Sequence, residues 1–72
     1  KSMLIKNVSG WVVSENIKYI VAREADGNWW YWGAWNDFEQ AHNAAVEVGG
    51  QVFPTAEVEV ELAYDKRGFC VA

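Results

Sequence analysis

The sequence predicts an α+β fold: an antiparallel sheet of four to five strands with one helix packed on one face, in the order β-β-β-α-β-β. Two observations support this fold class. The dipeptide Asp26-Gly27 lies between two strand-like segments, 18–24 and 29–35, and is the strongest hairpin signal in the chain. The alanine-rich segment 37–48 follows directly and ends at Gly49-Gly50, which is typical of a helix C-terminus.

The segments at the N-terminal end, 3–8 and 10–14, are rich in apolar residues and are interrupted at Ser9-Gly10. We therefore expect one bent strand or two short strands before the hairpin.

The hairpin register follows if Asp26 and Gly27 form the centre of the turn. The expected cross-strand pairs are Glu24 with Trp29, Arg23 with Trp30, Ala22 with Tyr31, Val21 with Trp32, Ile20 with Gly33 and Tyr19 with Ala34. Alternate residues of a strand point to opposite faces of the sheet. We expect the helix to cover the face formed by Tyr19, Val21, Arg23, Trp30, Trp32 and Ala34. The outer face then contains Lys18, Ile20, Ala22, Glu24, Trp29, Tyr31 and Trp35.

Helix-capping residues stand directly after the hairpin. Asn36 and Asp37 are both favourable caps, and Glu39 lies three positions after Asn36, as in a capping box. We expect the helix to run from about Asp37 to Val48. Its apolar stripe is formed at helical spacing by Phe38, Ala41, Ala45 and Val48. Because this stripe is mostly alanine, the bulky partners must come from the sheet, where the tryptophans lie.

The last third of the chain again has strand character. The apolar residues Val58, Val60, Leu62 and Tyr64 alternate with Glu57, Glu59 and Glu61, which predicts a half-buried strand. Residues 52–54 are expected to be an edge piece or the lead into this strand, because Pro54 cannot donate a backbone hydrogen bond. Residues 65–68 are expected to form a turn and 69–71 a short returning strand.

The length of 72 residues predicts one domain, expected to span 3–72. Lys1 and Ser2 precede Met3, which indicates two added residues ahead of the native start, with a removed leader as the alternative. Cys70 is the single cysteine and is expected to be a small buried side chain in a protein of a reducing compartment. No apolar run approaches the roughly 20 residues that a membrane-spanning helix needs. We therefore expect a cytoplasmic location and no membrane partner.

Charge and residue inventory disfavour nucleic acid binding and catalysis. Six basic and ten acidic residues give a net charge of −4, whereas affinity for nucleic acid depends on cations that neutralise phosphates. His42 is the single histidine and is expected to be structural. Glu57, Glu59 and Glu61 stand two positions apart, about 6.6 Å along a strand, so that they cannot easily converge on one ion. We expect no enzymatic activity, catalytic residue, cofactor or metal, and we expect the glutamates to form a solvated edge that resists strand pairing.

The aromatic segment 29–35 is the strongest functional signal, because it holds four of the five tryptophans. A strand this aromatic shows rings on both faces, and a small domain has one core to cover one of them. We expect the other face to be an interface, with Trp29, Tyr31, Trp35 and Ile20 as its contact residues. We expect the partner to be a second copy in a homodimer, or alternatively another protein or a planar ligand that stacks on the rings. A further alternative is a small accessory protein of a mobile element that modulates a host protein.

The run from Tyr31 to Ala41 (YWGAWNDFEQA) resembles the pattern of AP2-type and integrase-type DNA-binding domains. The resemblance implies a three-stranded sheet on one helix over about 18–48, whose face opposite the helix reads DNA through arginine and tryptophan. Tyr31 and Trp35 fall on the matching face. The arginines are missing here and Glu24 shares this face, so the resemblance supports the topology and leaves DNA binding as a minor alternative.

Overall fold

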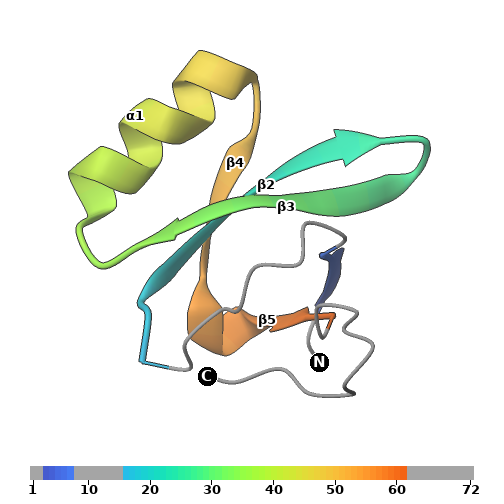
Figure 1. The fold of residues 1–72 in the computed structure, drawn as a ribbon, viewed down its shortest axis with the longest axis horizontal. Coiled ribbons are helices and arrows are strands. Elements are labelled where there is room, and N and C mark those ends of the chain that lie inside the picture. The colour runs from blue at the N-terminus through green and yellow to red at the C-terminus, as the bar shows by residue number, and fades with distance from the viewer. Residues whose placement is uncertain (1–2, 8–15, 62–72) are drawn as a thin grey trace, which may run out of the picture.

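The computed structural model describes residues 3–7 and 16–61, which form a five-stranded sheet with one helix (Figure 1). The elements in chain order are β1 (Met3–Lys6), β2 (Tyr19–Ala25), β3 (Asn28–Trp35), α1 (Phe38–Val48), β4 (Gln51–Pro54), the 3₁₀ turn η1 (Thr55–Glu57) and β5 (Val58–Val60). The α+β class and the order β-β-β-α-β-β are confirmed. The strand at 10–14, the turn at 65–68 and the strand at 69–71 were expected in segments that lie outside the described residues.

The sheet is mixed, although we expected it to be antiparallel. Its strands lie in the order β4-β2-β3-β1-β5. β2 pairs antiparallel with β3 and β4, whereas β1 runs parallel to both of its neighbours, β3 and β5. The first strand therefore lies between β3 and β5, and among the described residues β4 and β5 are the outermost strands.

The β2–β3 hairpin has the expected turn and a shifted register. Asp26 and Gly27 have φ values of 55° and 79°, the positive values that a two-residue hairpin turn with the twist of its strands requires. The pairs nearest the turn are confirmed: Glu24 with Trp29, Arg23 with Trp30 and Ala22 with Tyr31. The next expected pairs are wrong, because the register shifts between Val21 and Ala22. The observed pairs are Val21 with Gly33, Ile20 with Ala34 and Tyr19 with Trp35.

This bulge changes the direction of the side chains that follow it. One extra residue in β3, Trp32, exchanges the faces of all later residues relative to an uninterrupted ladder. Trp35 consequently turns to the helix side and its indole lies over Gly33, where a Cβ atom would be only 2.6 Å from Trp35 Cη2. Ala34 turns to the opposite side and packs with Ile20.

Helix α1 begins one residue later than a capping box at Asn36 would place it. The Asp37 side chain accepts a hydrogen bond from the backbone N–H of Gln40 at 3.0 Å and is the N-cap. The Asn36 amide oxygen instead accepts from the backbone N–H of Lys18 at 3.0 Å, joining the helix entry to the start of β2. Gly49 ends the helix with φ 72°, as expected of a glycine in the left-handed region.

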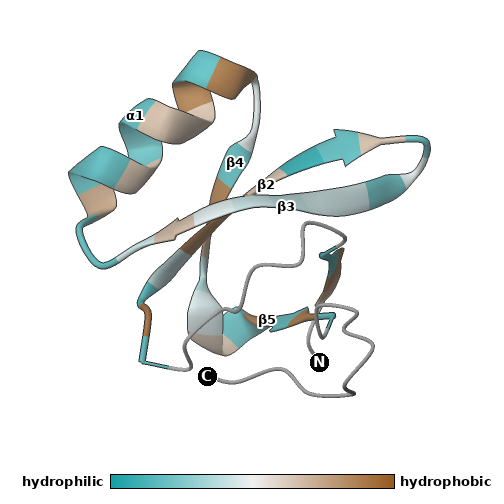
Figure 2. Ribbon diagram, in the orientation of Figure 1, coloured by the Kyte–Doolittle hydropathy of each residue, from teal (hydrophilic) through white to brown (hydrophobic). Residues whose placement is uncertain are grey.

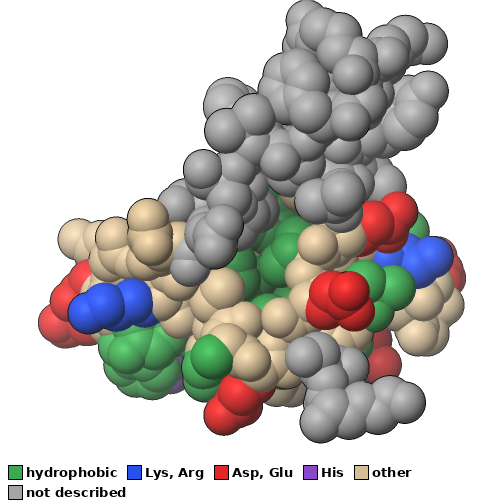
Figure 3. All heavy atoms as spheres, turned by 90° about the horizontal axis from the view of Figure 1, so that it is seen from below, with side chains coloured by type: hydrophobic (Ala, Val, Ile, Leu, Met, Phe, Trp, Pro, Cys, Tyr) green, Lys and Arg blue, Asp and Glu red, His purple; other side chains and the backbone are tan. Residues whose placement is uncertain are grey.

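The core lies on both sides of the sheet. On the helix side, Val21, Ala41 and Ala45 are buried, and the alanines allow α1 to approach β2 closely. On the opposite side, Ile5, Ile20 and Ala22 are fully buried. Hydropathy colouring places apolar residues on β2 and β4 and at the C-terminal end of α1 (Figure 2). Seen from the end remote from α1, hydrophobic side chains appear near the centre and at the lower left beside the histidine, with charged side chains between and around them (Figure 3).

The expected division of the hairpin into two faces is therefore partly wrong. Ile20, Trp29 and Tyr31 do lie on the side opposite the helix. Trp35 lies on the helix side, contrary to expectation, because of the bulge. Trp32 was expected beneath the helix but is 49% exposed.

Candidate protein-binding surface

The part of the hairpin nearest the turn carries a row of side chains that the helix does not cover. Arg23 of β2 pairs with Trp30 of β3, and Trp30 pairs with Lys6 of β1. Residues paired directly across a sheet point to the same face, so a cationic side chain flanks Trp30 on each side. Trp32 follows two positions later in β3 and lies on the same side.

Leu4 and Glu59 extend this row to the edge of the sheet. They pair across β1 and β5. Their chain neighbours Met3, Ile5, Val58 and Val60 all pack into the core opposite the helix. Since side chains alternate along a strand, Leu4 and Glu59 point the other way. We refer to the uncovered group as the tip surface, and it consists of Leu4, Lys6, Arg23, Trp30, Trp32 and Glu59.

Short-range contacts hold the aromatic rings of the tip surface in place. The Arg23 guanidinium carbon lies 5.4 Å from the centroid of the Trp32 ring, and Lys6 Nζ lies 6.0 Å from that of Trp30. The Trp30 indole N–H donates to the carbonyl oxygen of Ala25 at 3.0 Å. Each cation–π contact at an exposed site stabilises its geometry by about 0.5–1 kcal/mol. These contacts favour the observed ring positions in the free chain.

The tip surface exposes large apolar side chains to solvent. Trp32 and Leu4 are 49% and 47% exposed, although both belong to paired strands. Among the side chains of 3–7 and 16–61, the Arg23 and Lys6 cations lie against the rings of Trp32 and Trp30. A rigid aromatic area with available cations can bind apolar and anionic groups of another molecule.

The residues predicted to form the interface do not come together on one exposed face. Ile20 is fully buried. Trp29 packs edge-on against Phe53 of β4, with ring centroids 5.1 Å apart. Tyr31 lies on the same side, where burial raises the pKa of its phenol above the ordinary value of 10.0. Trp35 lies on the helix side. Their roles in binding stay predictions, but within the described chain these side chains mainly build the core.

Sequence reasoning assigned Trp30, Trp32 and Arg23 to the helix-covered core and gave no role to Lys6 or Leu4. One signal could have corrected a different error, the faces assigned to Ala34 and Trp35. A glycine inside a strand often marks a bulge or a close approach, and Gly33 lies in the middle of the most aromatic strand.

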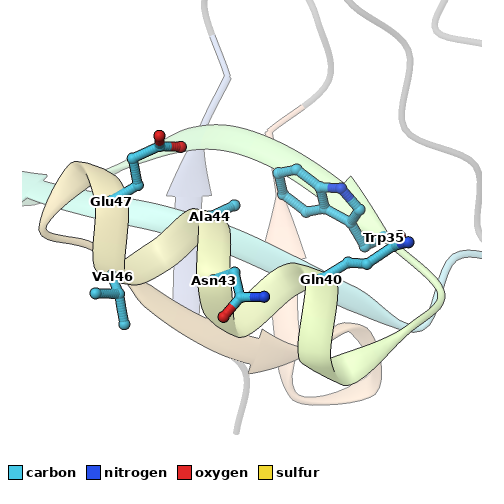
Figure 4. A pocket seen from close by; sticks show the side chains of 6 residues that line it. All are labelled: Trp35, Gln40, Asn43, Ala44, Val46 and Glu47. Atoms are coloured by element: carbon cyan, nitrogen blue, oxygen red, sulfur yellow. The ribbon is translucent and has the colours of Figure 1, made fainter.

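Trp35 and α1 together line a shallow groove, separate from the tip surface. The groove beside the indole has a volume of about 470 Å³ and is wide open (Figure 4). Its lining residues are Trp35, Gln40, Asn43, Ala44, Val46 and Glu47. The indole points toward the helix and packs in the core. This groove is therefore a margin of the helix–sheet contact with little shape to recognise a ligand.

His42 and the acidic side chains are the described residues to consider for metal binding. His42 stacks on Phe38, with ring centroids 5.9 Å apart and planes 18° from parallel. No group of three His, Cys, Asp or Glu side chains within 3–7 and 16–61 could hold a metal ion. In the same part of the chain, no helix has the length and apolar character required to cross a membrane.

Comparisons with known proteins give no assignment. No family model, no curated protein and no solved structure is significantly similar to this chain. Function must therefore be argued from the residues and their geometry.

Proposed function

We propose that this chain is a non-enzymatic interaction module, acting in the cytoplasm, that binds a protein through the tip surface. The observation that carries the proposal is Trp32, a large ring that is half exposed on a paired strand with Arg23 over its face. Tryptophan and arginine are the residues most enriched at energetic centres of protein interfaces. The contacts that favour their positions in the free chain reduce the entropy lost on binding.

A protein partner fits this surface better than duplex DNA does. In the AP2-type arrangement, the sheet face opposite the helix meets DNA. Here that face is occupied by the buried cluster of Ile5, Ile20 and Ala22. The cations lie on the other side, and two of them on a chain of net charge −4 provide little phosphate neutralisation. The role of an accessory protein of a mobile element is compatible with a protein-binding surface, and identification of the partner would test it.

Affinity capture with matched variants tests the proposal. The purified chain, Trp32→Ala and Val46→Ala serve as baits, and bound proteins, including further copies of the chain, are identified by mass spectrometry. Val46 is a suitable control because it is exposed but lies on α1, away from the tip surface. We expect binding to survive Val46→Ala and to be lost with Trp32→Ala, while both variants keep the wild-type circular dichroism spectrum. Equal binding by all three baits would show that the tip surface is not the binding site.

A further inference from the structure

We infer that the tip surface binds the tip surface of a second copy about a two-fold axis, with Arg23 of each copy against Glu59 of the other. This inference rests on the proposed function and names the partner. It is drawn from the order of charged and apolar groups across four neighbouring strands.

The two ends of the tip surface carry opposite charges. Across the strand order β2-β3-β1-β5, the surface begins at Arg23 and ends at Glu59. Three strand spacings separate these ends, about 14 Å, which is too far for the two side chains to pair within one copy. Both are exposed. Each end of the surface therefore has a charge available to a partner.

Rotation by 180° about an axis parallel to the strands places the strand order of one copy opposite the reversed order of the other, so that opposite charges face each other. When two copies face each other, β2 of one lies over β5 of the other, and β3 lies over β1. A two-fold axis along the strands keeps each residue at its own level, so Trp30 lies over Lys6 at both central positions. At both ends Arg23 lies over β5 two residues from the level of Glu59, an offset of about 6.6 Å that an arginine side chain can span. A two-fold interface uses the same patch on both copies, so each contact occurs twice. A partner of one uniform charge would meet like charge at one end.

The apolar content and the sheet edge favour face-to-face association. Leu4 and Trp32 are the exposed large hydrophobic residues of β1 and β3, and the dimer would cover both. Pairing through the β5 edge is disfavoured, because Glu57, Glu59 and Glu61 are all exposed along it and would repel their copies. The net charge of −4 also opposes association unless local contacts are complementary.

Charge reversal and mixing test the inference. Arg23→Glu and Glu59→Arg are each made, with Glu47→Arg on the exposed side of α1 as the control. Sedimentation equilibrium over a hundredfold concentration range gives the dissociation constant. We expect each single reversal to raise it about tenfold or more, and Glu47→Arg to leave it unchanged. An equimolar mixture of the two reversed variants should dimerise again, because every like-charge contact becomes an opposite-charge contact.

Restored association in the mixture is the decisive result, since a change in folding of either variant would not be repaired by mixing. The inference is overturned if the wild-type chain is monomeric throughout, or if the mixture associates no better than the single variants. In the first case, Trp32-dependent capture of another protein would leave the proposed function standing with a different partner. Loss of both self-association and Trp32-dependent capture would refute the proposed function itself.

Discussion

The two halves of the β2–β3 hairpin are both paired antiparallel, but their side chains differ in burial. In the base half, remote from the turn, Val21 is fully buried and Trp35 packs beside α1. In the tip half, next to the turn, Trp32 is 49% exposed and its ring is covered by Arg23. The bulge lies where the halves join. Residue type alone therefore does not decide burial here; the cover available on each side of the bulge does.

The short length of α1 explains why it leaves the tip half of the hairpin uncovered. An α-helix of 11 residues is about 16 Å long, whereas the eight residues of β3 extend about 26 Å. Even in the best alignment, α1 would leave about three residues of the strand uncovered on this side. Figure 1 shows the hairpin continuing well beyond the helix. A short helix on a long hairpin thus leaves a surface free for binding.

The largest expected difference between the halves is in stability. Ile20→Ala removes a fully buried side chain from the base half and should lower the free energy of unfolding by about 2–5 kcal/mol. Trp32→Ala removes a larger side chain but should cost about 1 kcal/mol or less, because half of the ring is already in water. Urea unfolding, followed at one low protein concentration to limit linkage to association, measures both. Equal losses would show that the tip half is packed as tightly as the base half.

These contrasts show what the sequence could predict. The turn at Asp26-Gly27, the helix from Phe38 to Val48 and the cap at Gly49 depend on local backbone preferences, and the sequence predicted them. The parallel pairing of β1 is non-local, and no residue of 3–6 specifies which strand lies beside it. The three pairs beyond the bulge were predicted wrongly for a different reason, because the expected register did not include the bulge that Gly33 could have indicated.

The candidate site was harder to predict, because its composition depends on that register. Alternation predicted correctly that Trp30 and Trp32 share a side with Arg23, but it could not show that α1 ends before reaching them. Trp35 was placed on the wrong side, since one extra residue in β3 exchanges the faces. The contribution of Lys6 and Glu59 follows only from the pairing of β1 with β3 and β5.

An intermediate effect is expected at the bulge itself. In Gly33→Ala, the new methyl group would lie 2.6 Å from Trp35 Cη2, so the indole must move out of its position beside the helix. We expect a loss of about 1–3 kcal/mol in unfolding free energy. The same substitution in a Trp35→Ala background should cost much less, because the clash is gone, and the double-mutant cycle isolates this coupling. Additive losses would show that Gly33 is required for another reason, such as backbone conformation.

The smallest expected effect distinguishes two adjacent residues on opposite faces of the tip half, Tyr31 and Trp32. Burial raises the pKa of the Tyr31 phenol above 10.0, so the folded chain holds this proton more tightly than the unfolded chain does. The resulting stabilisation is fully present below pH 10.0 and is lost as the pH rises through the raised pKa. In an ultraviolet titration of the folded chain, Tyr31→Phe should remove phenolate absorbance that develops late, above pH 10.0, and stability should decline less steeply just above pH 10.0. Trp32→Ala should leave that late component in place, because its ring lies on the other face. If Tyr31→Phe instead removes absorbance that develops near pH 10.0, the phenol is solvated. The face of the tip half opposite the helix would then be open to water.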